Sequence, residues 1–75
     1  MIQTDLFHQM VYKDADGFYA IMDYTQPTPC AQVYTPQDEW CGGTGATNHY
    51  SQMGDIRYII KWRKQWEASG MGLQA

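Results

Sequence analysis

The sequence predicts an α+β domain in which a small antiparallel sheet of about three strands is packed by a C-terminal amphipathic helix. Three observations carry this prediction. A turn sequence separates two segments rich in strand-forming residues, a third such segment follows a proline-containing loop, and apolar residues recur at helical spacing near the C-terminus. A chain of 75 residues is the size of one small domain. We therefore expect a single domain spanning residues 1–75.

The first two strands are expected at Leu6 to Lys13 and at Phe18 to Tyr24. Between them lies the sequence Asp-Ala-Asp-Gly, residues 14–17. Aspartate favours turns through its side chain, and Gly17 suits a position with positive φ. The two strands are therefore predicted to form a hairpin.

A third strand is expected at Cys30 to Tyr34, after a stiff loop over residues 25–29 that contains two prolines. The alternation of side chains along a strand would place Ala31 and Val33 on one face of the sheet. The other face would then carry Cys30, Gln32 and Tyr34.

Residues 35–40 are expected to form one helical turn. Thr35 can cap such a turn, Pro36 suits its first position, and Asp38 and Glu39 lie where the helix dipole favours anions. The glycine-rich residues 41–50 are expected to be a loop, and residues 71–75 a loose tail.

The C-terminal helix is predicted over residues 55–68, where Asp55 at the start and Gly70 just past the end are boundary signals. Alternation of apolar and basic residues between Ile56 and Trp66 also fits a strand, and this alternative stays open. Segment length and end signals favour the helix. In a helix, apolar side chains at spacings of three and four would form one stripe, made of Met53, Ile56, Ile59, Ile60, Trp62 and Trp66.

Charge is distributed unevenly along the chain. The net charge is −3, yet residues 1–55 contain one basic residue against seven acidic ones, and residues 56–75 contain four basic residues against one acidic. This asymmetry indicates either an anionic partner at the basic end or a basic segment that complements the acidic remainder within the fold. The second interpretation is favoured.

Nucleic acid is the alternative partner. In a helix, Arg57, Lys61 and Lys64 would form a cationic stripe flanked by Trp62 and Trp66. Basic residues interleaved with aromatic residues are the components of a single-stranded nucleic-acid platform, here the segment 57–66. The acidity of the whole chain argues against this function, because nucleic-acid-binding domains are usually basic.

No cofactor, metal centre or catalytic site is predicted. The candidate ligands His8, Cys30, Cys41 and His49 include no pair closer than eight positions, whereas zinc ligands usually come in pairs two to four apart. Cys41 with His49 could serve as nucleophile and base, but no orienting third group accompanies them. The cysteines are expected to be free thiols in a reducing cytosol, and an oxidising compartment could bridge them.

Neither a signal peptide nor an apolar run long enough for a membrane span is present in the sequence. We therefore expect a location in the cytoplasm of the host cell and no membrane partner.

Six Tyr and three Trp supply the surfaces from which a binding site is predicted. Both residue types favour interfaces because each has an apolar body and a polar tip. The residues expected to be exposed and to bind a partner are Tyr19, Tyr24, Tyr34, Trp40, Tyr58, Trp62 and Trp66.

In small size, acidity and lack of catalytic motifs, the chain is similar to the short accessory proteins of bacteriophages that inhibit host or defence enzymes. This resemblance implies a stoichiometric inhibitor or adaptor. The predicted function is thus non-catalytic binding of a protein partner. A structural subunit of a larger assembly and a homo-oligomer are the remaining alternatives.

Overall fold

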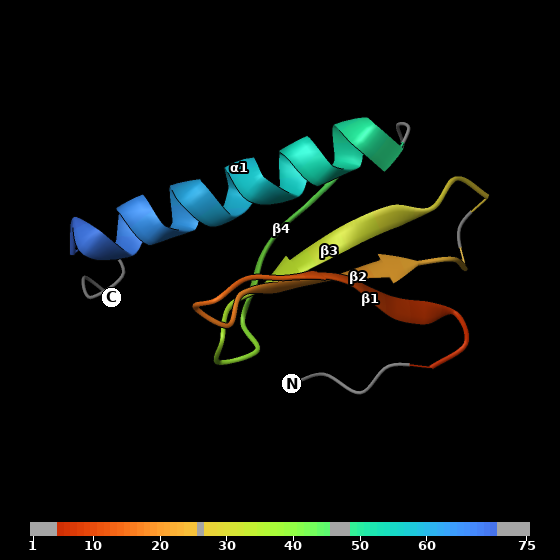
Figure 1. The fold of residues 1–75 in the computed structure, drawn as a ribbon, viewed down its shortest axis with the longest axis horizontal. Helices are drawn as coiled ribbons and strands as arrows, with labels where there is room; N and C mark the ends of the chain where they lie inside the picture. Colours follow the sequence, from red (N-terminus) through yellow and green to blue (C-terminus); the bar gives the residue numbers. More distant parts are fainter. Residues whose placement is uncertain (1–4, 26, 46–48, 71–75) are drawn as a thin grey trace.

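The computed structural model describes residues 5–25, 27–45 and 49–70, and only the backbone of residues 49–51. Four antiparallel strands form one sheet in the order β1-β2-β3-β4, namely β1 (His8–Lys13), β2 (Tyr19–Asp23), β3 (Cys30–Tyr34) and β4 (Trp40–Gly43). The helix α1 (His49–Ala68) packs on one face of this sheet (Figure 1). The predicted α+β class is confirmed, and the sheet has one strand more than expected.

The β1–β2 hairpin turns at residues 14–17, as predicted. Gly17 has a φ of 97°, a conformation that side chains disfavour. The Asp14 carboxylate accepts the backbone N–H groups of Asp16 and Phe18 at 2.9 and 3.0 Å. This turn packs against the turn between β3 and β4, because a Cβ at position 17 would lie 3.2 Å from Cβ of Pro36.

The third strand has the bounds and the alternation predicted for it. Ala31 and Val33 are fully buried on the face that α1 covers. The other three side chains of β3 lie on the opposite face and are half-buried.

Residues 35–39 form a hairpin turn and Trp40 begins β4, so the prediction of a helical turn over residues 35–40 is wrong. The N–H of Thr35 donates to the carbonyl of Glu39 at 2.8 Å, and the Thr35 hydroxyl accepts the N–H groups of Gln37 and Glu39. Asp38 takes a φ of 67°, which a right-handed helix does not allow. The capping signal at Thr35 was real, but a threonine hydroxyl serves a tight turn as well as a helix start.

The loop predicted over residues 41–50 is wrong at both ends. Residues 41–43 complete the edge strand β4, and α1 already begins at His49. Glycine has low strand propensity, but β4 requires it because α1 passes close by. A Cβ at Gly42 would lie only 3.0 Å from Cγ2 of Ile59.

The C-terminal helix is confirmed, and the strand alternative for this segment is wrong. Ile56 and Ile60 are buried, whereas Trp62 and Trp66 are exposed, so the two tryptophans do not belong to the buried stripe. Further along α1, Arg63 and Lys64 take the positions nearest the sheet, three and four residues beyond Ile60.

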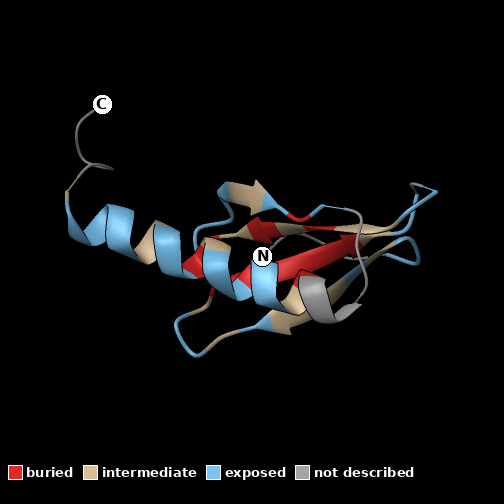
Figure 2. Ribbon diagram, turned by 90° about the horizontal axis from the view of Figure 1, so that it is seen from above, coloured by how far each residue is buried: buried red, intermediate tan, exposed pale blue. Residues whose placement is uncertain are grey.

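The core lies between α1 and the central strands (Figure 2), and it consists of Phe18, Ala20, Met22, Ala31, Val33, Ile56 and Ile60. Near its start α1 is held by Gln52, whose amide donates to the carbonyl of Pro29 at 2.9 Å. The C-terminal part of α1 extends beyond the sheet, which leaves it mostly exposed (Figures 1 and 2).

The tail predicted over residues 71–75 lies outside the described residues. Among the residues that the structure describes, no helix has the length and apolar character needed to cross a membrane.

Candidate partner-binding groove

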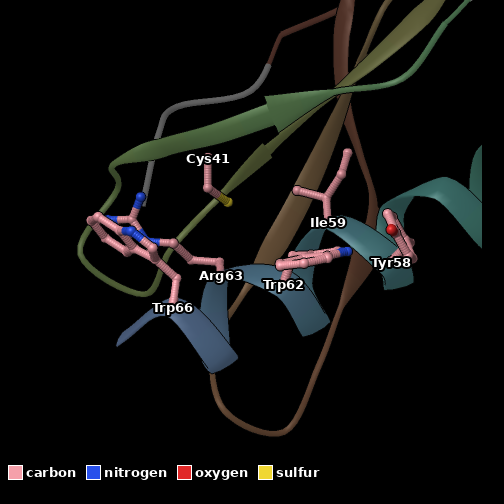
Figure 3. Close-up of a pocket in the computed structure, with 6 residues that line it drawn as sticks. All are labelled: Cys41, Tyr58, Ile59, Trp62, Arg63 and Trp66. Atoms are coloured by element: carbon pink, nitrogen blue, oxygen red, sulfur yellow. The ribbon is translucent and has the colours of Figure 1, made fainter. Parts of the chain in front are cut away.

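An open groove of about 410 Å³ lies between the edge strand β4 and the helix α1 (Figure 3). Its α1 wall consists of two neighbouring rows of side chains, since residues four apart share one side of a helix. The lining is almost entirely apolar, and it comprises Cys41, Tyr58, Ile59, Trp62, Arg63 and Trp66.

One of these rows, made of Tyr58, Trp62 and Trp66, is the exposed part of the lining and is called the aromatic row below. The side chains of Tyr58 and Trp62 are 61% and 55% exposed, although both belong to a well-formed helix. Their rings meet edge to face, with centroids 6.1 Å apart and an interplanar angle of 72°. The two rings therefore stiffen each other while most of their apolar surface still faces solvent.

Arg63 closes one end of the groove and is held there from both sides. Its guanidinium lies 4.5 Å from the ring centroid of Trp66. It also pairs with Glu39 of the β3–β4 turn at 3.0 Å and with Glu67 of α1 at 3.1 Å. Arg63 thus joins α1 to the turn that precedes β4.

Cys41 supplies the β4 wall and is not suited to act as a nucleophile. Burial raises the pKa of its thiol, which keeps it protonated at neutral pH. The thiol contacts the carbonyl of Val33 at 3.4 Å. The side chain of His49, its predicted base, lies outside the described residues.

Cys30 and Cys41 are both free thiols and lie on opposite faces of the sheet. Cys41 packs against the core beneath α1, whereas Cys30 lies on the other face, where the Gln32 amide contacts its sulfur at 3.7 Å. This arrangement contradicts the alternative that an oxidising compartment could bridge them, because a disulfide needs Cβ atoms that point toward each other.

The cationic stripe predicted from Arg57, Lys61 and Lys64 is interrupted. Lys64 binds the carboxylates of Asp14 and Asp16 in the β1–β2 turn. With the ion pairs of Arg63, this contact bears out the favoured interpretation for Arg63 and Lys64, two of the four basic residues of the segment. Within the described ranges, Arg57 and Lys61 take part in no ion pair, and both are exposed.

Lys64 also lies on a different side of α1 from Trp62 and Trp66. Successive residues are about 100° apart around a helix. Trp62 and Trp66 line the groove beside β4, whereas Lys64 reaches the opposite flank, where β1 and β2 meet. The prediction that these tryptophans flank a stripe containing Lys64 is therefore wrong.

Tyr19 is 1% exposed, so its prediction as an exposed binding residue is wrong. Its ring stacks on that of Tyr34 with centroids 5.4 Å apart, and its hydroxyl donates to the Asp38 carboxylate. Tyr34 is therefore held in a stacked pair and is only half-exposed.

Tyr24 and Trp40 are exposed but lie outside the groove. The Trp40 indole donates to Oε1 of Gln32 at 2.7 Å, on the face of the sheet opposite α1. Of the seven predicted aromatic residues, the structure brings together Tyr58, Trp62 and Trp66.

Three residues of the groove were missed as site residues, namely Cys41, Ile59 and Arg63. Ile59 and Arg63 could have been found from helical spacing. They are four residues apart, and each directly follows a residue of the aromatic row. Cys41 could not, since its role depends on β4, which the sequence did not predict.

Among the described residues, no three His, Cys, Asp or Glu side chains gather in a way that could hold a metal ion. Searches of protein-family models, of curated proteins and of solved structures find no match to this chain. A functional proposal therefore rests on the geometry of the groove and on the charges around it.

Proposed function

We propose that this chain is a small non-catalytic interaction protein that binds a protein partner through the groove between β4 and α1. It would act as a stoichiometric inhibitor or adaptor in the cytoplasm of the host cell. The observation that carries the proposal is the aromatic row, three large side chains exposed side by side along an apolar groove.

Single exposed apolar residues are ordinary on protein surfaces, but contiguous ones mark interaction sites. Trp, Tyr and Arg dominate the binding energy of protein interfaces, and the lining contains two Trp, one Tyr and one Arg. The packing of Arg63 on Trp66 and of Tyr58 on Trp62 holds these side chains in place before binding. Less conformational entropy is then lost when a partner binds.

Binding of single-stranded nucleic acid is the weaker candidate. Arg57 and Lys61 remain available to phosphates, but Arg63 and Lys64 already bind carboxylates of the same chain. The net charge of −3 adds a general repulsion of a polyanion.

Affinity capture from the native host, with the chain carrying a photo-cross-linker beside the groove, tests the proposal. We expect a cross-linked protein band that is lost in Trp62→Ser and retained in Trp40→Ser. Trp40 is a matched control because it is 62% exposed, against 55% for Trp62, and lies on the opposite face of the sheet. Equal capture by both variants would show that the groove is not the binding site.

Salt dependence separates the two candidates. Phosphate contacts make the affinity fall by about one log unit per tenfold rise in salt for each neutralised phosphate. An interface centred on aromatic residues should show a much flatter dependence.

A further inference from the structure

The aromatic row has the length and direction of a helix-binding surface. Tyr58, Trp62 and Trp66 follow one another at intervals of four residues, so the row extends over about two helical turns, or roughly 12 Å. It follows the axis of α1 and is bordered on one side by β4. An elongated occupant lying along α1 would cover all three rings.

The edge strand β4 is poorly suited to pairing with an added strand. Its pairing with β3 is interrupted at Cys41, because Val33 pairs with Gly42 and Tyr34 pairs with Trp40. A bulge of this kind twists an edge strand and hinders further strand pairing. The occupant therefore gains more from apolar contact with α1 than from backbone hydrogen bonds to β4, which favours a helix with an apolar stripe.

The charged residues beside the aromatic row indicate the charge of the segment that binds there. Arg57 and Lys61 directly precede Tyr58 and Trp62, so they flank the row on the side away from β4. Both are exposed, and no carboxylate of the described residues pairs with them, whereas Arg63 and Lys64 are paired. Carboxylates on a partner would complement these two cations.

A second copy of the chain fits this surface less well. Two-fold pairing of aromatic rows in antiparallel helices, centred on Trp62, would bring the two copies of Lys61 together. Each copy also carries a net charge of −3, so the two would repel each other as whole molecules.

We infer that the groove takes an amphipathic helix of a partner protein, whose apolar stripe covers the aromatic row and whose carboxylates meet Arg57 and Lys61. This inference rests on the proposed function and adds the shape and charge of the partner segment. The inference predicts the opposite of what net charge alone would give, because a chain with a net charge of −3 should otherwise favour a basic peptide.

The test uses the full chain and two fluorescein-labelled helical peptides of about 18 residues, or five turns. Both carry leucine at positions i, i+3, i+4 and i+7. Glutamate flanks the leucines in one peptide, and lysine flanks them in the other. We expect the acidic peptide to bind at least about tenfold more tightly than the basic one. Trp62→Ser should weaken binding of the acidic peptide by about 30-fold or more, and Trp40→Ser should leave it unchanged.

The double variant Arg57→Glu with Lys61→Glu should reverse the preference, so that the basic peptide binds more tightly. The reversal shows that these two positions set the charge selectivity. Circular dichroism melting of each variant checks that the fold is retained. Equal affinities for the two peptides, a preference of the unaltered chain for the basic one, or no binding of either would overturn the inference.

Two further measurements identify competing occupants. Sedimentation that shows self-association lost in Trp62→Ser would assign the groove to a second copy. Binding of a single-stranded DNA oligonucleotide that is lost in the same variant would assign it to nucleic acid, and either result would overturn the inference. If cellular capture of a protein requires Trp62 but the acidic peptide does not bind, the proposed function stands and the inference alone fails.

Discussion

The ammonium of Lys64, on α1, lies 3.1 Å from Oδ2 of Asp14, in the turn that joins β1 to β2. The two residues are 50 positions apart in the sequence. The same ammonium also binds Asp16 and lies 5.3 Å from the ring centroid of Phe18, a core residue. One side chain thus ties the C-terminal half of the helix to the first hairpin.

This contact predicts a specific dependence of stability on pH. Partial burial raises the pKa of Asp14, but the Lys64 ammonium and the N–H groups of Phe18 and Asp16 outweigh it and lower the pKa overall. Because the folded pKa lies below the unfolded one, Asp14 stabilises the fold above about pH 4. We expect this contribution to disappear as the pH falls through the lowered pKa.

Lys64→Met should weaken the acid dependence that Asp14 causes. Urea unfolding midpoints measured between neutral pH and pH 2 should fall less steeply in this variant than in the unaltered chain. Lys61→Met is the matched control, since Lys61 is exposed and has no ion pair among the described residues. The same acid slope in both variants would contradict a role for the Lys64–Asp14 pair.

Gly17→Val should lower the free energy of unfolding by about 1 kcal/mol or more. The φ of 97° is strained for any side chain, and a Cβ there would also press on Pro36 at 3.2 Å. Thermal or urea unfolding followed by circular dichroism measures the loss. Gly45→Val is the control, because no heavy atom lies within 4 Å of a Cβ built there. An unchanged unfolding curve for Gly17→Val would argue against this turn.

Gly42→Ala should lower the free energy of unfolding by about 1–3 kcal/mol, because the added methyl forces α1 away from β4. A Cβ there would lie 3.0 Å from Cγ2 of Ile59. Adding Ile59→Leu removes that branch methyl, so the double variant should recover part of the loss. A double-mutant cycle measures the coupling between the two positions. Purely additive effects would mean that the two residues do not touch.

Gly54→Ala should raise the free energy of unfolding by about 0.5–1 kcal/mol. Gly54 lies within α1, is exposed, and has nothing within 4 Å of the Cβ that alanine would add. The gain comes from lower backbone entropy in the unfolded chain. Urea unfolding at neutral pH measures it, and a destabilised variant would contradict a regular helix at this position.

The parts of the fold that were predicted correctly have local causes. Asp14 and Gly17 define a turn by themselves, and the two prolines before Cys30 set the start of β3. The edge strand β4 has no such signal. From sequence alone, Gly42 and Gly43 indicate a loop. The structure shows why glycine is needed in the strand, because a Cβ at Gly43 would lie 2.8 Å from Oε1 of Gln32. Tertiary contact, not local propensity, places these glycines in a strand.

The aromatic residues of the site were predicted by type but not by exposure. Tyr19 and Tyr58 look alike in sequence, yet Tyr19 is buried by stacking on Tyr34 and by its bond to Asp38. Helical spacing placed Trp62 near the edge of the apolar stripe. The sheet covers Trp62 only if it extends far enough beneath α1. The extent of the sheet depends on the order of all four strands, which local sequence does not give.

Trp62 and Ile56 should respond in opposite ways to truncation, although both are apolar residues of α1. Ile56 is fully buried in the core, so Ile56→Ala should cost about 2–5 kcal/mol of unfolding free energy. Trp62 keeps 55% of its surface exposed, so Trp62→Ser should change the unfolding free energy by about 1 kcal/mol or less. Partner capture should show the reverse order, being lost in Trp62→Ser while the folded fraction of Ile56→Ala still binds. Urea unfolding and capture on the same two variants give both readouts. If Trp62→Ser unfolds the chain as readily as Ile56→Ala does, the row on α1 serves the stability of the fold and not the binding of a partner.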